Sequence, residues 1–305
     1  MIQGLRWGMS AYETEEDLAR EVGVLETLGV SLSRSVAERP DFRDVEILVV
    51  NSGVCVDRQV LDSARSLRLI VTTTSGSDHI DVESAKARGV AVGRCPMARR
   101  DAVVDTSMAM GLALLRRIPV LQHSAQEGRW VRDALPVLAP TRVREMKVGL
   151  VGVGVIGTQA MLRWKALGAE VRFHDPSRTG SVHCDELCEW SDLLSLHCSL
   201  SESSRHLLNS DRIRLLRPGA IVVNTARGDC IDLEALFQAR HLGGIGLDVF
   251  AEEPPQELGD WASRDNVLLT PHAAGFHPNM AKEVCSEVAE AVSAFLAGEP
   301  LPASL

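Results

Sequence analysis

The sequence predicts an α/β fold made of two doubly wound units, in which helices cover both faces of a parallel sheet. Three observations support this prediction. Short apolar runs alternate with helix-spaced segments along most of the 305 residues, which is typical of βαβ units. A glycine-rich turn at 152–157 joins one apolar run to a helical segment. The length allows one large domain or two smaller ones, and the alternation runs twice.

The N-terminal part of the chain predicts a small, complete α/β domain. Its expected strands are the short apolar runs Leu5–Met9, Val30–Leu32, Ile47–Val50, Leu67–Thr72 and Val90–Val92. Its expected helices, where apolar residues recur at helical spacing, are Glu13–Leu28, Arg58–Ser66 and Val82–Arg88. Because strands and helices alternate, the strands should pair in parallel.

A long apolar helix is expected at Ala102–Leu121, directly after this domain. Its apolar residues, Met108 and Leu114 among them, favour a buried crossover or interface helix. The next segment, Gln122–Arg144, is mixed in character and contains Pro136 and Pro140, so we expect a loop there.

A second alternation of strands and helices begins after this loop. Its expected strands are Val148–Val151, Val171–His174, Leu193–His197, Ile221–Asn224, Ile245–Val249 and Val267–Thr270. The last long helix, roughly Pro278–Leu296, is amphipathic, and a Gly-Glu-Pro sequence follows it.

The composition argues against several classes of protein. With 32 Lys and Arg against 41 Asp and Glu, the net charge is −9, which disfavours a general nucleic-acid binder. No apolar run approaches the roughly 18–20 residues that span a bilayer, and the N-terminus lacks the layout of a signal peptide. The seven cysteines form no C-x-x-C pair, so we expect a reduced, cytoplasmic setting and no metal site.

The glycine-rich turn is the G-x-G-x-x-G pattern of dinucleotide sites, set between a strand and a helix. Gly152 makes the tight turn, Gly154 lets the backbone approach a pyrophosphate, and Gly157 allows close helix–strand packing. Asp175 ends the next strand, where its carboxylate can bond the ribose hydroxyls and repel a 2′-phosphate. This favours NAD over NADP; Arg178, three residues on, either softens the preference or is a solvated arginine.

Three further segments begin where later strands end, at the edge of the sheet where open α/β folds bind ligands. They are Asn224–Gly228 (N-T-A-R-G), Asp248–Pro254 (D-V-F-A-E-E-P) and Thr270–Gly275 (T-P-H-A-A-G). With the glycine turn upstream, the chain resembles the D-isomer-specific 2-hydroxyacid dehydrogenase family, which includes phosphoglycerate dehydrogenases and glyoxylate and hydroxypyruvate reductases. The resemblance runs over nearly the whole length. It implies an NAD-dependent oxidoreductase acting on a small 2-oxo or D-2-hydroxy acid.

The resemblance implies three catalytic residues, and each fits its role chemically. Arg227 would clamp the substrate carboxylate and polarise the 2-oxo group, as a planar guanidinium can. His272 would be the general acid in reduction and the base in oxidation. Glu253 would hold the other imidazole nitrogen and favour the protonated ring.

The resemblance also implies further contacts. Ser75 and Gly76 match a loop whose backbone amides receive the substrate carboxylate, and Asp248 matches the acid that bonds the nicotinamide carboxamide. Cys198 is expected to be a small apolar wall beside the adenosine rather than a redox switch. Other positions that match cofactor contacts are Val155, Ile156, Thr225, Ala226 and Ser107, although Ser107 serves helix packing almost equally well.

Two arginines depart from the family pattern. Arg99 and Arg100 stand where relatives commonly carry Asn-Thr. They suggest a substrate with a second anionic group, bound by Arg99, and the alternative is exposed arginines paired with Asp101. Asn51 argues against the first interpretation, because phosphate-handling relatives often carry arginine there.

The resemblance implies a domain organisation and an oligomeric state. A smaller, flavodoxin-like substrate domain would comprise 1–97 plus 277–305, and a Rossmann NAD-binding domain would comprise 98–276. The Ala102–Leu121 helix and the loop after it resemble a dimerisation element, which implies a homodimer through the NAD-binding domain. The alternative function is an NAD(H)-sensing binding protein, like the transcriptional corepressors that resemble these enzymes.

Overall fold

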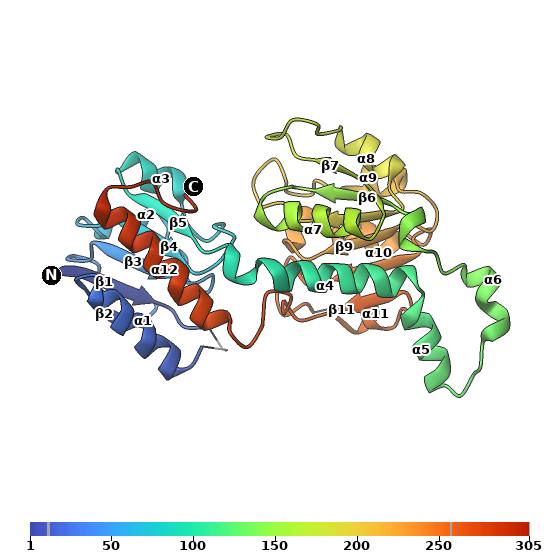
Figure 1. Ribbon diagram of the computed structural model, residues 1–305, viewed down its shortest axis with the longest axis horizontal. Coiled ribbons are helices and arrows are strands. Elements are labelled where there is room, and N and C mark those ends of the chain that lie inside the picture. The colour runs from blue at the N-terminus through green and yellow to red at the C-terminus, as the bar shows by residue number, and fades with distance from the viewer. Residues whose placement is uncertain (11–12, 257, 305) are drawn as a thin grey trace. The chain divides into compact units, whose positions relative to one another are not determined.

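The protein is described by a computed structural model that covers residues 1–10, 13–256 and 258–304. The chain forms two compact units (Figure 1). The first unit is Met1–Arg99 with His277–Leu305, and the second is Arg100–Phe276. Each unit contains one parallel sheet, of five and six strands respectively, which confirms the predicted α/β class with two doubly wound units.

The sheet of the first unit has the strand order β2-β1-β3-β4-β5, which is the flavodoxin-like order. Its strands are β1 (Ile2–Trp7), β2 (Val30–Ser35), β3 (Ile47–Val50), β4 (Leu69–Thr72) and β5 (Ala91–Arg94). All five predicted strands are therefore present. The first begins and ends earlier than the predicted Leu5–Met9, because the chain turns at Gly8, whose φ is +86°.

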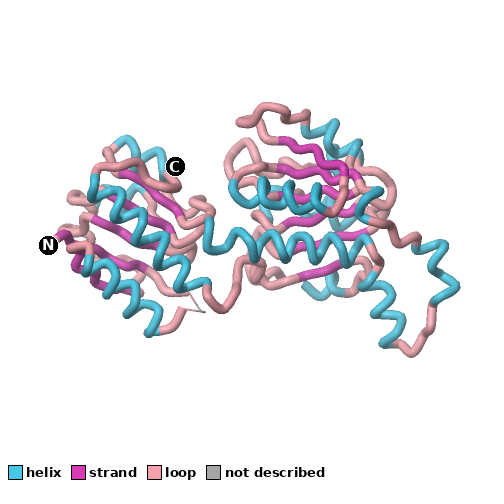
Figure 2. Tube along the Cα trace, in the orientation of Figure 1, coloured by secondary structure: helices cyan, strands magenta, loops and turns pink. Residues whose placement is uncertain are grey.

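Helices cover both faces of this sheet (Figure 2). On one face α1 (Glu15–Thr27) packs beside α12 (Met280–Ala297), and their apolar residues form a core that includes Leu25 and Val288. On the other face lie α2 (Arg58–Ser63) and α3 (Val82–Ala87). The first helix begins where Thr14 and Asp17 form a reciprocal capping box.

The sheet of the second unit has the order β11-β10-β9-β8-β6-β7. Its strands are β6 (Lys147–Val151), β7 (Glu170–His174), β8 (Leu193–Leu196), β9 (Ile221–Asn224), β10 (Gly244–Leu247) and β11 (Val267–Leu269). All six predicted strands are present. Because β6 pairs with β7 on one side and β8 on the other, the strand order reverses there, and ligands bind at such a switch point.

Two long helices cover one face of the second sheet and four short ones cover the other. The long ones are α4 (Met97–Leu115) and α7 (Val155–Ala166), and the buried Trp164 of α7 packs against Gly111 of α4. A Cβ at Gly111 would lie 2.9 Å from Leu193 Cδ1, so glycine lets α4 approach the sheet. The short helices are α8 (Cys184–Trp190), α9 (Ser210–Leu215), α10 (Leu233–Gln238) and α11 (Leu258–Ala262).

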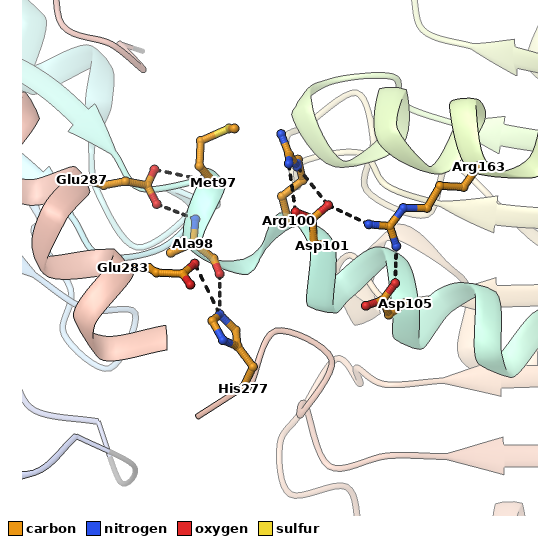
Figure 3. A network of polar contacts seen from close by, with 9 residues as sticks. All are labelled: Met97, Ala98, Arg100, Asp101, Asp105, Arg163, His277, Glu283 and Glu287. Carbon is orange, nitrogen blue, oxygen red and sulfur yellow. Dashed lines mark hydrogen bonds and ion pairs between the residues drawn. The ribbon is translucent and has the colours of Figure 1, made fainter. Parts of the chain in front are cut away.

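The single helix predicted at Ala102–Leu121 is wrong in its bounds. In the structure α4 begins at Met97, because Glu287 of α12 accepts the N–H groups of Met97 and Ala98 at 2.9 and 2.5 Å (Figure 3). The helix ends at Leu115, since Arg117 adopts a φ of +58°.

The loop predicted at Gln122–Arg144 is partly helical. A second helix, α5 (Ile118–Gln126), extends into it, followed by α6 (Leu135–Leu138) and the 3₁₀ turns η1 (Arg132–Ala134) and η2 (Val143–Glu145). We call residues 118–145 the α5–α6 arm. Arg117 ties this arm to the rest of the second unit, because its guanidinium donates to the carbonyls of Leu138, at 3.0 Å, and of Gly243. In the described ranges, no helix is long and apolar enough to cross a membrane.

Candidate active site

The turn after β6 requires glycine at two of its three motif positions. Gly152 has a φ of +85°, and a Cβ there would lie 2.7 Å from Cys198 Cα. A Cβ on Gly157 would lie 2.0 Å from the Gly152 carbonyl oxygen. At Gly154 the opposite holds, because an added Cβ would meet nothing within 4 Å. The turn is therefore tight on the protein side and open beside Gly154.

Next to this turn lie a helix N-terminus and a carboxylate. The first residues of α7, Val155 and Ile156, carry N–H groups that lack intrahelical acceptors. Asp175 accepts the Val153 N–H at 2.9 Å and the Ser177 hydroxyl at 2.7 Å. Burial would raise the pKa of Asp175, but these hydrogen bonds outweigh it and lower the pKa below its usual value. An ionised carboxylate is thus held beside the turn.

The other predicted cofactor positions differ in their surroundings. Thr225 is 9% exposed, and its hydroxyl has no hydrogen-bond partner within the described ranges. Ala226, next to it, is buried. Ser107 is also buried, and its hydroxyl bonds the Val104 carbonyl of its own helix at 2.9 Å. Cys198 lies against the glycine turn, with its Sγ 3.7 Å from that of Cys230.

Arg227 is presented by a turn that its own motif residues stabilise. The fully buried Asn224 accepts the Ala226 N–H at 3.0 Å and donates to the Arg227 carbonyl at 2.8 Å. A Cβ on Gly228 would lie 2.0 Å from the Phe250 carbonyl carbon. Glycine at this position therefore allows the turn to pack against the segment that leads to Glu253.

His272 and Glu253 form a short charged pair. His272 Nδ1 lies 2.7 Å from Glu253 Oε2, and Glu253 Oε1 accepts the Phe250 N–H at 3.0 Å. The hydrogen bond to Glu253 raises the pKa of His272, against burial and the charge of Arg227, which lower it. Burial would raise the pKa of Glu253, but the bonds from His272 and Phe250 lower it overall. Both groups are therefore stabilised in their charged forms.

Asp248 holds the loop that carries His272. Its buried carboxylate accepts the Thr270 hydroxyl at 2.5 Å and the N–H groups of Ala273 and Ala274 at 2.8 and 3.1 Å. Its carbonyl accepts the His272 N–H at 2.8 Å. These bonds sustain the φ of +51° at His272, a left-handed conformation that costs a non-glycine residue free energy.

Three of the remaining predicted residues lie in or beside the loop after β4, in the first unit. Ser75 and Gly76 belong to this loop, and Arg99 donates to the Thr73 carbonyl. Arg100, by contrast, belongs to the second unit, where it pairs with Asp101 at 2.9 Å.

The ion pair of Arg100 is part of a larger network in the second unit. Arg163 of α7 bonds Asp101, at 2.8 Å, and Asp105, so the three side chains tie α7 to α4 (Figure 3).

Comparisons with known proteins identify the family. The profile described as D-isomer specific 2-hydroxyacid dehydrogenase, NAD binding domain, matches residues 108–274. The chain is 33% identical over 301 residues to the D-3-phosphoglycerate dehydrogenase of Methanocaldococcus jannaschii. The chain belongs to this family. That alignment covers 94% of the chain but 56% of the relative, so the chain spans about half of that protein's length.

Two further members of the D-2-hydroxyacid dehydrogenase family match the chain over most of both lengths. The hydroxypyruvate reductase of Thermotoga maritima is 35% identical, over 82% of this chain and 84% of the reductase. The solved D-lactate dehydrogenase of Aquifex aeolicus, complexed with NAD and lactic acid, is 26% identical with a TM-score of 0.83. That match covers 97% of this chain and 96% of the lactate dehydrogenase.

Within this family member, the structure brings Arg227, Glu253 and His272 onto loops of one unit, after β9, β10 and β11. Two residues of the site have roles that were not predicted from the sequence: Asn224 stabilises the Arg227 turn, and Thr270 bonds Asp248. Asn224 begins the N-T-A-R-G motif and Thr270 begins the T-P-H-A-A-G motif, so each stands next to a predicted catalytic segment in the sequence. In the described ranges, no group of three or more His, Cys, Asp or Glu residues is arranged to hold a metal ion.

Proposed function

We propose that the chain is an NAD-dependent D-2-hydroxyacid dehydrogenase that reduces a small 2-oxo acid. The observation that carries this proposal is the 2.7 Å contact between His272 and Glu253, electrostatically coupled to Arg227 in the unit with the glycine turn. Family membership supports the reaction class.

The residues around the glycine turn fit a dinucleotide. The open space at Gly154 and the N-terminus of α7 suit a pyrophosphate, which Val155 and Ile156 would bind together with Gly152 and Gly157. The Thr225 hydroxyl, which has no hydrogen-bond partner in the part of the chain that the structure describes, offers a polar contact to such a ligand. Other proposed contacts are Ala226, Cys198, Ser107 and Asp248.

Asp175 gives the proposed preference for NADH over NADPH. Its lowered pKa keeps the carboxylate ionised, so it would accept hydrogen bonds from ribose hydroxyls. The same charge would repel a 2′-phosphate at that position. Arg178 follows three residues later and is exposed, so it offers at most a partial compensation.

The reaction chemistry follows from the charged pair. NADH, when bound, supplies the hydride that reaches the substrate C2. The Arg227 guanidinium would bind the substrate carboxylate and polarise the 2-oxo group. Because His272 Nδ1 faces Glu253, its Nε2 is the nitrogen that would donate a proton to the substrate oxygen. Before this proton is transferred, the Glu253 carboxylate would stabilise the protonated imidazole ring of His272.

Substrate selection would involve the first unit. The backbone amides of Ser75 and Gly76 would receive the substrate carboxylate, and Arg99 would favour a substrate with a second anionic group. Comparing kcat/KM for mono- and dicarboxylic 2-oxo acids, in the wild type and in Arg99→Ala, tests the second point. An unchanged ratio would remove Arg99 from substrate selection.

We further propose a cytoplasmic homodimer that assembles through the second unit. The α5–α6 arm exposes Ile118, Trp130 and Val137, and exposed apolar groups of this size favour burial against a partner. Light scattering coupled to size exclusion would give twice the monomer mass, falling to the monomer mass for a Trp130→Glu, Val137→Glu variant. A monomeric wild type would contradict the proposal.

The test of the proposed activity is NADH oxidation with hydroxypyruvate and glyoxylate as substrates. We expect turnover of at least one, with a D-hydroxy acid as the product where the product is chiral. Tight NADH binding without turnover of any 2-oxo acid would instead favour the NAD(H)-sensing alternative.

A further inference from the structure

The loop Thr73–Gly76, which follows β4, has every one of its carbonyl oxygens hydrogen-bonded. Backbone and hydroxyl donors hold two of them: Cys95 N–H bonds Thr74 O at 3.1 Å, and the Thr74 hydroxyl bonds Gly76 O at 2.7 Å. Arginines hold the other two, as Arg99 Nη1 donates to Thr73 O and Arg94 Nη1 donates to Ser75 O at 3.3 Å.

The N–H groups of this loop differ: that of Thr73 bonds the Val50 carbonyl at 2.8 Å, and the other three are in the opposite situation. In residues 1–10, 13–256 and 258–304, no acceptor lies within hydrogen-bonding geometry of the N–H of Thr74, Ser75 or Gly76. A planar trans peptide directs its N–H opposite to its carbonyl. Fixing Thr73 O and Ser75 O therefore also fixes the direction of the Thr74 and Gly76 N–H groups. The bond from Cys95 to Thr74 O fixes the Ser75 N–H in the same way, and successive backbone N–H groups are able to bind an anion.

The two arginines come from hydrogen-bonded elements of the first unit. Arg94 ends β5 and is paired with Thr72 of β4, and its Nε is buried without a partner in the described ranges. Arg99 lies in the first turn of α4, whose N–H groups are held by Glu287 (Figure 3). Each guanidinium therefore holds the loop from a hydrogen-bonded element and adds positive charge near the loop amides.

We infer that Arg94 and Arg99 are positioning residues: Arg94 orients the 75–76 peptide so that the Gly76 amide faces the substrate carboxylate, and Arg99 fixes the 73–74 peptide that leads into the Ser75 and Gly76 amides. The inference rests on the proposed function, because it takes a 2-oxo acid as the ligand. Arg94 gives the cleaner test, since Arg99 is also proposed to contact a second anionic group directly.

The first experiment compares Arg94→Gln, Arg94→Lys and the wild type in steady-state reduction of hydroxypyruvate and glyoxylate. Loss of a charged hydrogen bond to the loop should raise KM for the 2-oxo acid about tenfold, with kcat and the NADH Kd unchanged. Lysine keeps a donor and the charge, so it should restore part of the loss. The matched control is Arg88→Gln, in the same unit, which removes a bond to the Ser84 carbonyl at 2.7 Å and should leave KM unchanged.

The second experiment measures hydrogen exchange of the peptide that contains the 73–76 loop, with NAD⁺ and hydroxypyruvate present so that no reduction occurs. The wild type should gain protection at this loop, and Arg94→Gln should lose most of that gain. Equal protection in both, or an Arg94→Gln variant with wild-type KM, would overturn the inference. A joint fall of kcat, KM and melting temperature, without a change in loop protection, would also overturn it.

The two proposals fail in different ways. Ligand protection of the loop that depends on Arg94, without turnover of either 2-oxo acid, would contradict the proposed function alone. Turnover that is indifferent to Arg94 would contradict the inference alone.

Discussion

The Glu253→Gln substitution isolates the charge of the carboxylate that faces His272. Glutamine keeps an oxygen acceptor of similar shape for His272 Nδ1, which lies 2.7 Å from Glu253 Oε2. It removes the negative charge that raises the pKa of His272. Reduction requires the imidazolium, so kcat/KM falls as pH rises through this pKa. A raised pKa extends activity to higher pH, and the substitution should move the falling limb to lower pH.

The size of the shift follows from the exposure of the pair. The side chains of His272 and Glu253 are 51% and 36% exposed, so solvent screens their attraction. Exposed pairs contribute about 0.2–1 kcal/mol, and hydrogen bonds to charged groups about 1.5–3 kcal/mol. A value of about 1 kcal/mol for this half-exposed pair corresponds to roughly 0.7 pH units, at about 1.4 kcal/mol per unit. On the alkaline limb, kcat/KM should therefore fall about fivefold.

The assay is kcat/KM for hydroxypyruvate reduction across pH, measured for the wild type, Glu253→Gln and Glu252→Gln. Glu252 is the adjacent, exposed acid and serves as the matched control, so its variant should keep the wild-type profile. A falling limb that stays in place for Glu253→Gln, or that moves to higher pH, would refute the reasoning.

Four other substitutions have defined outcomes. Asp175→Ala should raise the ratio of NADPH to NADH kcat/KM at least tenfold, because it removes the charge facing the ribose; an unchanged ratio would contradict that role. Arg227→Lys should lower kcat/KM about a hundredfold with an unchanged NADH Kd, since an ammonium cannot form a bidentate contact; near-wild-type turnover would contradict it. In urea unfolding, Trp164→Ala, at a side chain 1% exposed, should cost about 3–5 kcal/mol. Val36→Ala, at a residue of the first unit that is 78% exposed, should cost under about 0.5 kcal/mol, and equal costs would contradict the core assignment.

The strands were predictable because parallel strands that are buried on both faces consist of continuous apolar residues. Two predicted strands, Ile47–Val50 and Ile221–Asn224, match the structure residue for residue. The helix break at Arg117 was not predictable from spacing, because apolar residues continue at helical intervals on both sides. Pro119 was the local signal, since proline is tolerated only in the first turn of a helix.

Residues of the candidate site were predictable where the groups that constrain them are close in the sequence. Gly152 and Gly157 follow from the tightness of one turn, and the structure gives each a steric reason. Contacts between distant segments were not predictable, because spacing carries no information about which loops meet. The bonds from Glu287 to Met97, and from Arg94 to Ser75, depend on tertiary packing alone.

The central claim is that this chain reduces a 2-oxo acid with a proton from His272. It is tested most directly by measuring NADH oxidation and NADH binding for the wild type and His272→Ala on the same protein preparations. We predict turnover of hydroxypyruvate or glyoxylate by the wild type, a loss of at least about a hundredfold in kcat for the variant, and an unchanged NADH Kd. Equal losses of turnover and NADH binding, or undiminished turnover without the imidazole, would contradict the account.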